Sequence, residues 1–407
     1  MPPVSSVYVH FPWCLAKCPY CDFVSYAATP ASIDHEGYAD AVVRELDARA
    51  DALGSSADVR PLETVTSVFF GGGTPSLWDP RALGRVLAAI EARLAVAARP
   101  ELEVTVECNP TSLDADRARA LADVGVNRLS VGTQSLRADQ LAFLGRLHDV
   151  AGARRSVEAA VSAGVRVSTD LIFGLHGQSP ADAAAQATEL ASLGLSHLSC
   201  YQLTIEPGTQ FGARHKRGLL PVALDEDVAS AFLAVHDALA DAGLEHYEIS
   251  NFAKPGERAR HNVAYWRGEP YVGLGCAAVG FARRVPDADG AARGVRWKNE
   301  AGPERYVEAT RAVSRVRVGE GDGLSEGAEE LAADALLRER IMLGLRMRDG
   351  IDLDAAGAEL GVDPWTAERA RAAESLAARG RIERRAGWIG VPAGAWLFTD
   401  DTAARLF

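Results

Sequence analysis

Apolar and polar positions follow two alternating patterns along the first 250 residues of this chain. Four times, an Ala- and Leu-rich amphipathic run ends at a glycine and is followed by an apolar stretch of strand length. These glycines are Gly125, Gly164, Gly194 and Gly243. Because glycine is suited to the left-handed cap that ends a helix, each unit predicts a helix and then a strand. Repetition at intervals of roughly thirty to fifty residues predicts tandem βα modules, whose long crossovers enforce parallel strands.

The same pattern predicts the positions of the strands. We expect strands at 7–10, 65–70, 102–107, 128–132, 166–172, 197–203 and 245–249. Helical stretches such as 82–97 and 115–123 join neighbouring strands. Six or seven parallel strands predict an α/β fold, a partial or full βα barrel.

The pattern changes after residue 250. Residues 251–330 are less regular, and helical patterns return over 330–347, 353–365 and 366–379. The last two stretches, followed by Trp388-Ile-Gly-Val, look like a helix-turn-helix with a small wing. Their mixed charge favours a packing or docking module over DNA binding. The expected parts are a barrel over 1–250, a connecting segment over 251–330 and a small helical, winged-helix-like domain over 331–407.

Composition narrows the class of protein. The hydrophobic fraction of 48% is ordinary for a packed protein, and no stretch approaches the roughly 18 apolar residues of a membrane span. No charged and apolar run resembling a signal peptide precedes Tyr8. The formal charge of -12 argues against a general affinity for nucleic acid, which needs clustered Lys and Arg. We expect a cytoplasmic protein with no membrane span and no nucleic-acid partner.

Three of the six cysteines, Cys14, Cys18 and Cys21, lie within eight residues. In a reducing compartment, clustered cysteines indicate metal binding or catalysis. Three thiolates are one fewer than usually fill an iron–sulfur cluster, so this spacing can leave one iron open to a ligand. The alternative is a zinc site with His10 as the fourth ligand, although the spacing matches neither paired CxxC motifs nor CxxC with HxxxH.

Polar or glycine-rich segments follow nearly every predicted strand. In a parallel βα barrel the active site gathers at the carboxyl ends of the strands, so these segments are expected to share one mouth with the cysteines. The turn Gly71-Gly-Gly-Thr-Pro75 lacks the lysine of a phosphate-binding loop, but its glycines let a ligand approach the backbone closely. The other strand-end residues are Tyr8, His10, Glu107, Gln134, Asp170 and Tyr201, with Arg146 following Gln134.

Two motifs, the CxxxCxxC spacing with Tyr20 before its last cysteine and the GGGTP turn, resemble the radical S-adenosylmethionine (radical SAM) superfamily. Further motifs resemble the oxygen-independent coproporphyrinogen III oxidase family and, within it, the HemW-type haem chaperones. The resemblance covers essentially the whole chain. Its motifs are Tyr8-x-His-x-Pro-x-Cys14, Glu107-Cys-Asn-Pro110, Gly132-Thr-Gln134, Leu144-Gly-Arg-Leu-His148, Asp170-Leu-Ile-Phe-Gly-Leu175, Tyr201-Gln-Leu-x-x-Glu-Pro-Gly-Thr209 and His261-Asn-x-x-Tyr-Trp266.

The resemblance implies a partial (βα)6-type radical SAM barrel and a [4Fe-4S] cluster held by Cys14, Cys18 and Cys21. It also implies that S-adenosyl-L-methionine occupies the open iron and that a reductant such as flavodoxin or ferredoxin supplies an electron. The radical chemistry then belongs to cluster and cofactor, and the protein places them. By motif position, the residues expected to contact S-adenosylmethionine are Tyr8, Tyr20, Gly72, Gly73, Thr74, Glu107, Gln134, Arg146 and Asp170.

Two functions remain open within this family: oxidative decarboxylation of coproporphyrinogen III, and binding of haem for transfer to an unidentified acceptor protein. The oxidases resemble one another in a longer arm before the cysteines and a further cysteine two residues after the third. This chain has seven residues before Tyr8 and has Phe23 at the second position. Both departures favour the haem chaperone, with the oxidase as the alternative, and no catalytic residue is assigned. An unrelated radical enzyme would share the cysteine motif but not the downstream motifs.

The expected haem contacts are His261, Tyr265 and Trp266. A neutral His261 imidazole is a candidate ligand of the haem iron, and the two aromatic rings suit the macrocycle. After Gly273-Leu-Gly275 the family usually has a Gly-Ala-His-like stretch, whereas this chain has Cys276-Ala-Ala-Val-Gly280. For Cys276 we favour a small core residue over a soft ligand.

Overall fold

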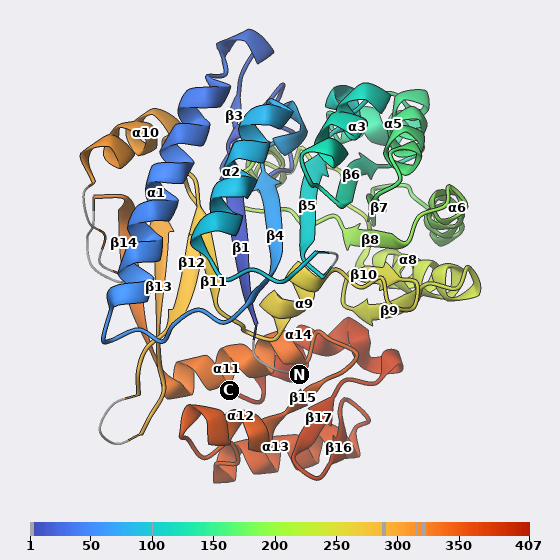
Figure 1. The fold of residues 1–407 in the computed structure, drawn as a ribbon. Helices are drawn as coiled ribbons and strands as arrows, with labels where there is room; N and C mark the ends of the chain where they lie inside the picture. Colours follow the sequence, from blue (N-terminus) through green and yellow to red (C-terminus); the bar gives the residue numbers. More distant parts are fainter. Residues whose placement is uncertain (1–3, 100, 287–289, 314–315, 317, 319–322) are drawn as a thin grey trace.

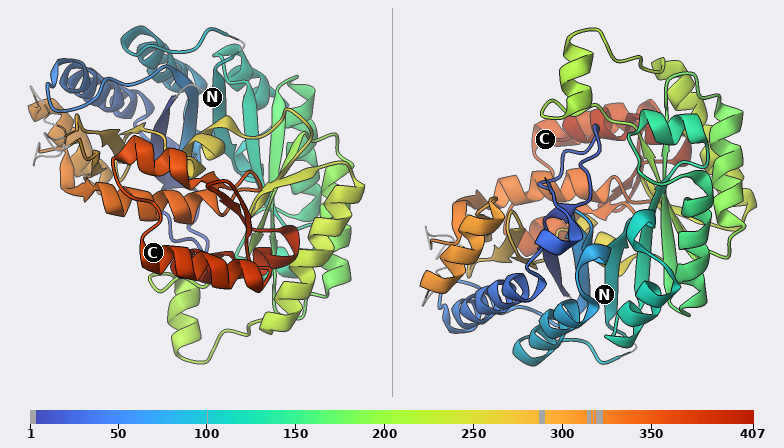
Figure 2. Two further views of the ribbon diagram at one scale, coloured as in Figure 1. Left: turned by 90° about the horizontal axis from the view of Figure 1, so that it is seen from below. Right: turned by 90° about the horizontal axis from the view of Figure 1, so that it is seen from above.

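The computed structural model describes residues 4–99, 101–286, 290–313, 316, 318 and 323–407. Within these residues, the largest element is a sheet of twelve strands, curved into an open arc (Figures 1 and 2). A parallel block forms its middle. The strands of this block, in order, are β1 (Ser5–Phe11), β4 (Val65–Gly72), β5 (Glu103–Cys108), β6 (Arg128–Gln134), β7 (Arg166–Phe173) and β8 (His197–Gln202).

Helices on the outside of the arc connect the parallel strands (Figure 1). The main ones are α1 (His35–Ser55), α2 (Pro80–Arg93), α3 (Ala115–Asp123), α5 (Val150–Ser162), α6 (Pro180–Ala191) and α8 (Asp225–Asp241). The glycines predicted to end helices do so: Gly164 and Gly243 follow α5 and α8 with φ of 73° and 78°. A side chain there would meet the steric cost of the left-handed region. The predicted repeat of helix, glycine and strand is confirmed.

We predicted that the strand at 245–249 would be the seventh parallel strand, beside β8, and this pairing was wrong. Strand β9 (Glu245–Glu248) does not pair with β8, because β10 (Asn251–Ala253) lies between them and is antiparallel to both. Only two residues separate β9 from β10, and a parallel crossover needs roughly a dozen or more. The chain therefore turns back as a hairpin at this edge.

Residues 251–330, which we expected to be a connecting segment, contribute to both edges of the sheet. Strand β11 (Tyr271–Leu274) pairs parallel with β1, and the strands beyond it are antiparallel. Helix α9 (Arg260–Trp266) packs against β1 and β4 near their amino-terminal ends (Figure 1). The further elements of this region are β12 (Val279–Arg283), β13 (Arg293–Asn299), α10 (Pro303–Ala312) and β14 (Ser325–Ala332).

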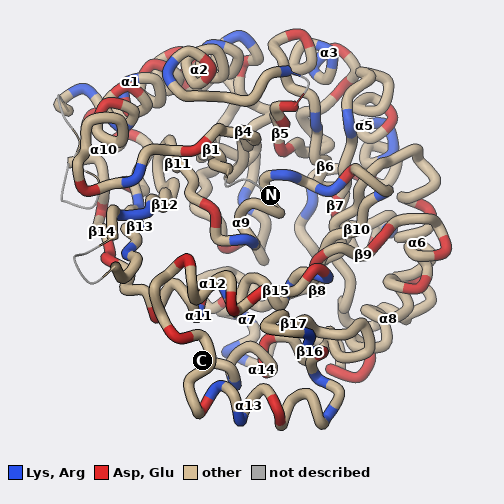
Figure 3. Tube along the Cα trace, turned by 60° about the horizontal axis from the view of Figure 1, so that its bottom comes forward, with Lys and Arg blue, Asp and Glu red and all other residues tan. Residues whose placement is uncertain are grey.

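The C-terminal residues form a smaller unit with its own apolar core. It lies at the amino-terminal ends of the parallel strands, opposite the cysteine loop (Figures 1 and 2). Basic and acidic residues are interspersed along it (Figure 3). Its elements fit the predicted helical, winged-helix-like fold: α11 (Ala333–Gly344), β15 (Ile351–Asp352), α12 (Leu353–Leu360), α13 (Ala367–Ala378), β16 (Glu383–Arg385), β17 (Trp388–Gly390) and α14 (Thr399–Ala404).

Backbone hydrogen bonds join this unit to the barrel. Ile249 N donates to Arg346 O at 2.9 Å, and Arg348 N donates to Tyr247 O at 3.0 Å. None of the helices in the described part of the chain is long and apolar enough to cross a membrane. The shorter elements are β2 (Trp13–Cys14), β3 (Tyr26–Ala27), α4 (Ala138–Phe143), α7 (Gln210–Lys216) and 3-10 turns at Pro30–Ser32, Pro75–Leu77, Pro110–Ser112 and Ala393–Phe398.

Candidate functional site

A cavity of about 1270 Å³ lies inside the arc of the sheet. Its wall includes His10 and Gly72 near the cysteine loop, His261 on α9, and Trp396 in the C-terminal unit. Pockets for one small molecule usually measure roughly 300–1,000 Å³, so this cavity is large enough for a bulky ligand beside a cofactor. We name two regions: the cysteine end, around Cys14, Cys18, Cys21 and the turn 71–75, and the α9 end, around His261, Tyr265 and Trp266.

Two side chains donate hydrogen bonds to the cysteine sulfurs. Thr74 Oγ1 lies 3.3 Å from Cys14 Sγ, and Arg146 Nη1 lies 3.3 Å from Cys18 Sγ. Burial raises the pKa of the Cys14 and Cys21 thiols. In the described residues, no three His, Cys, Asp or Glu side chains converge as the ligands of one metal ion do. A [4Fe-4S] cluster does not require three ligands at one point, because each cysteine thiolate binds a different iron at a separate corner of the cluster.

His10 is not free to serve as the fourth ligand of a zinc site. Its Nε2 lies 2.8 Å from Val24 O, a carbonyl that only accepts, so Nε2 carries the hydrogen. Its Nδ1 then accepts from the Tyr8 hydroxyl at 3.1 Å. Burial lowers the pKa of His10 to about 4, which keeps the ring neutral. Because both ring nitrogens are engaged, the zinc interpretation loses the ligand on which it depended.

The glycine turn after β4 is tied to the cysteine loop through its backbone. Gly73 N donates to Phe11 O at 2.7 Å, and Thr74 N donates to Trp13 O at 2.9 Å. A Cβ on Gly73 would lie 2.7 Å from Trp13 O, so only glycine permits this approach. The turn is thereby held beside the cysteines.

Two neighbouring carboxyl groups lie beyond this turn. Glu107 Oε2, at the end of β5, accepts from Gly72 N at 3.1 Å. Burial, followed by the charge of Asp170, raises the pKa of Glu107 to about 8, and burial raises the pKa of Asp170 to about 6. Carboxyls with raised pKa values are typical of functional sites. A cation placed between them would stabilise both carboxylates and lower both pKa values.

Arg146 reaches the cysteine end from the loop after α4. Its Nη2 donates to Gly132 O at 2.8 Å, and its buried Nε has no hydrogen-bond partner among the described residues. Gln134 ends β6 with φ of 65°, a left-handed conformation that is unfavourable for a residue with a side chain. Such strain concentrates at functional sites.

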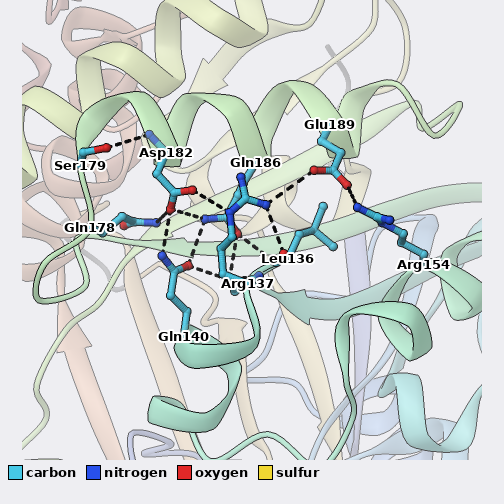
Figure 4. A network of polar contacts seen from close by, with 10 residues as sticks. Leu136, Arg137, Gln140, Arg154, Gln178, Ser179, Asp182, Gln186 and Glu189 are labelled. Carbon is cyan, nitrogen blue, oxygen red and sulfur yellow. Dashed lines mark hydrogen bonds and ion pairs between the residues drawn. The ribbon is translucent and has the colours of Figure 1, made fainter.

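A polar network holds the segment that carries Gln134 and Arg146 (Figure 4). Gln186 Oε1, on α6, accepts from Leu136 N at 2.7 Å. Asp182 accepts from Arg137 Nε at 2.8 Å and from Gln140 Nε2 at 2.9 Å. The network fixes α4 to α6 and so sets the direction of the loop that follows.

These residues fit the group that the cysteine spacing implies. Three thiols, a backbone-lined turn, a guanidinium with one unpaired buried N–H, and two carboxyls suit an iron–sulfur cluster with a zwitterionic, cationic ligand. Tyr8 lines the cavity, and Tyr20 packs against the apolar cluster of Leu144, Ile172 and Leu175.

The α9 end brings all four residues of the His261-Asn-x-x-Tyr-Trp266 motif to the cavity wall. The His261 ring stacks on Phe69 with centroids 4.9 Å apart, and its pKa is lowered to about 4 by burial. Tyr265 is 48% exposed, and its ring centroid lies 5.8 Å from that of Trp266. An apolar, half-open surface of this kind can receive a flat ligand.

Two residues near the cavity, Glu248 and Ser67, belong to none of the sequence motifs. Glu248 ends β9 and lines the cavity, and burial raises its pKa to about 8. Ser67 lies beneath His261, with Oγ 3.1 Å from His261 Nδ1. A strand-end position could have identified Glu248, and alternation with Phe69 could have placed Ser67 on the inner face. Cys276 is fully buried beside Tyr38, in agreement with a core residue.

Comparisons with known proteins agree with this geometry. The family model described as the radical SAM superfamily matches residues 8–187, and the one described as the HemN C-terminal domain matches residues 331–398. Among solved structures, coproporphyrinogen III oxidase (HemN) from Escherichia coli has a similar fold, with a TM-score of 0.77 and 19% identity. The match covers 99% of this chain and 90% of that one.

Two sequence relatives have a higher sequence identity to this chain than that structure has. The haem chaperone HemW of Escherichia coli is 39% identical over 77% of this chain and 79% of its own length. The mitochondrial radical S-adenosyl methionine domain-containing protein 1 of Danio rerio is 36% identical over 85% of this chain and 74% of its own length. The chain therefore belongs to the HemW haem-chaperone family of the radical SAM superfamily.

Proposed function

We propose that this protein binds haem at the α9 end of the cavity, carries an S-adenosylmethionine-ligated [4Fe-4S] cluster at the cysteine end, and transfers the haem to an acceptor protein. The observation that carries the proposal is the cavity itself. Its volume of about 1270 Å³ extends from Gly72 and Glu107, beside the cysteine loop, to His261 and Trp266 on α9, so a cluster-bound cofactor and a flat aromatic ligand could share it.

At the cysteine end, Cys14, Cys18 and Cys21 would hold the cluster. When bound, the cluster and S-adenosylmethionine supply one-electron chemistry, and this chain supplies their placement. Arg146 is suited to a carboxylate group because its buried Nε has no other partner among the described residues. Glu107 and Asp170 are suited to an ammonium group because both are buried carboxyls with raised pKa values, which a nearby cation would lower.

At the α9 end, His261 would ligate the haem iron, and Tyr265 and Trp266 would pack against the macrocycle. The C-terminal unit, which we propose to be a separate domain over 331–407, would close the cavity with Trp396, Leu397 and Phe398. The haem would pass to an acceptor protein, and a reductant such as flavodoxin or ferredoxin would supply an electron to the cluster.

Oxidation of coproporphyrinogen III is the second candidate, favoured by the likeness of fold to the Escherichia coli oxidase over nearly the whole chain. Phe23 favours the chaperone, because the oxidases place a further cysteine at that position. Its side chain is 56% exposed beside the cysteine loop.

The test is anaerobic reconstitution of the cluster, followed by a haem titration in the Soret band and a chromatographic assay for protoporphyrinogen. We expect saturable haem binding and no decarboxylated product. Rapid decarboxylation, or the absence of haem binding, would contradict the proposed function.

A further inference from the structure

Two histidines line the cavity in the described part of the chain, and they differ in what their ring nitrogens do. Both nitrogens of His10 are hydrogen-bonded, to Val24 O and to the Tyr8 hydroxyl. His261 has a partner only at Nδ1, which lies 3.1 Å from Ser67 Oγ. Within the described residues its Nε2 has no hydrogen bond, although the residue lies at the cavity wall.

The neighbours of Ser67 decide which His261 nitrogen carries the hydrogen. The Ser67 hydroxyl donates its single hydrogen to Ser6 Oγ at 2.9 Å. Only its lone pairs then remain for His261 Nδ1, so Nδ1 is the donor of that contact. A neutral imidazole that carries its hydrogen on Nδ1 keeps the electron pair on Nε2.

The two serines are fixed in place. Ser6 and Ser67 are directly opposite each other on the parallel strands β1 and β4, and their exposed fractions are 3% and 0%. Two further contacts fix the histidine: its ring stacks on Phe69 at an interplanar angle of 27°, and its backbone N donates to Glu103 Oε1 at 3.1 Å. The ring is therefore held from below and from one face.

A second serine–histidine pair in the same barrel provides an internal comparison. Ser168 Oγ lies 2.7 Å from His197 Nδ1, and His197 Nε2 lies 2.8 Å from the Tyr247 hydroxyl. That histidine is 1% exposed, and both of its nitrogens are engaged. The same pairing therefore has a structural role at His197, whereas at His261 it leaves one nitrogen available.

We propose that Ser67, oriented by Ser6, is a positioning residue that holds His261 in the form protonated at Nδ1 and presents the Nε2 electron pair to the iron of haem. This inference rests on the proposed haem function. Histidines that bind metals commonly donate their other ring N–H to a fixed acceptor, which sets the ring orientation and raises the basicity of the ligating nitrogen.

The test compares full-length variants Ser67→Ala, Ser6→Ala, Ser168→Ala and His261→Ala. Each is titrated with haem and examined by resonance Raman spectroscopy of the ferrous complex. We expect Ser67→Ala to weaken haem binding by roughly tenfold or more, the usual loss when such a partner of a metal ligand is removed. Its iron–histidine stretching band should move to lower frequency, because the ligand becomes less basic. Ser168→Ala should leave both unchanged.

Ser6→Ala separates hydrogen-bond direction from packing. Without Ser6 as acceptor, the Ser67 hydroxyl is free to donate to Nδ1 and favour the other tautomer, so haem binding should weaken although Ser67 is retained. The positioning role would be overturned if Ser67→Ala and Ser6→Ala both kept the wild-type haem affinity and iron–histidine band. If His261→Ala lost that band, His261 would still stand as the ligand. A wild-type band in His261→Ala would overturn the histidine ligand and the inference with it. Failure of the wild-type protein to bind haem would overturn the proposed function.

Discussion

The two ends of the cavity are built differently. At the cysteine end, loops from several strands are tied to one another: Thr74 and Arg146 donate to cysteine sulfurs, and Gly73 is pinned to Phe11. At the α9 end, one short helix presents its residues, and Tyr265 is 48% exposed. The arrangement at the cysteine end is suited to a permanently bound group, and the arrangement at the α9 end to a ligand that binds and is released.

The separation of the two ends follows from strand geometry. His261 contacts β4 at Ser67, four residues before Gly71 of the glycine turn. At roughly 3.3 Å per residue, this is about 13 Å along the strand. Tyr8 occupies the intervening space, with its ring centroid 6.4 Å from that of His261 and its hydroxyl on His10. Changes at one end are therefore expected to leave the other intact.

The largest expected effect is the loss of the cluster. The triple variant Cys14→Ala, Cys18→Ala, Cys21→Ala should lose all iron–sulfur absorbance after reconstitution and keep the barrel folded, because the three cysteines lie outside the twelve-stranded sheet. Cys276→Ala is the matched control and should retain the cluster. Cluster absorbance in the triple variant would refute the ligand assignment.

The second effect concerns S-adenosylmethionine. Arg146→Ala should weaken its binding to the reconstituted protein by roughly 10- to 100-fold, since a hydrogen bond to a charged group contributes about 1.5–3 kcal/mol. Calorimetric titration measures this loss. Arg154→Ala, which removes an exposed arginine paired with Glu189 on the outer helices, is the control. Unchanged binding in Arg146→Ala would remove this residue from the site.

The third effect tests the α9 end alone. Trp266→Ala should weaken haem binding by roughly three- to tenfold, because an aromatic contact contributes about 0.5–1.5 kcal/mol beyond the area it buries. S-adenosylmethionine binding should not change. Trp365→Ala, in the turn between α12 and α13, removes a tryptophan from outside the cavity and should leave both affinities as they are. A parallel loss of both ligands in Trp266→Ala would break the proposed independence of the two ends.

The smallest effect is a dependence of stability on pH at the cysteine end. Burial raises the pKa of Glu107 to about 8, above its ordinary value, so the folded protein without cluster holds a proton that the unfolded chain has released. The stabilisation from this bound proton is fully present below about pH 4.3, the pKa of glutamate in the unfolded chain. It is lost as the pH rises towards 8, where the free energy of unfolding falls by at most about 1.4 kcal/mol per pH unit.

Glu107→Gln should flatten this decline in a series of urea unfolding experiments between pH 5 and pH 8. Glu248, with a pKa raised to about 8, adds a separate slope that the variant retains. Glu368→Gln, on the exposed first turn of α13, is the control and should follow the wild-type curve. Parallel curves for Glu107→Gln and the wild-type protein would contradict a buried, protonated Glu107.

The local parts of the fold could be predicted from the sequence, and the parts that depend on distant contacts could not. Helix-ending glycines and apolar strands located the parallel block because both signals lie within a few residues. The three-residue strand β10 is too short to carry an alternating pattern, so the pairing of β9 was predicted wrongly. The contact of Ser67 with His261 joins positions 194 residues apart, and no local pattern contains it.

The most direct test of the two-ended cavity is a haem titration of the triple cysteine variant beside the wild-type protein. If haem binds at the α9 end, the variant without a cluster should bind one haem with an affinity within about threefold of wild type, since the two ends share no ligand. The same Soret maximum is expected for both. Loss of haem binding together with the cysteines would contradict the account, because it would place the haem on the cysteine end.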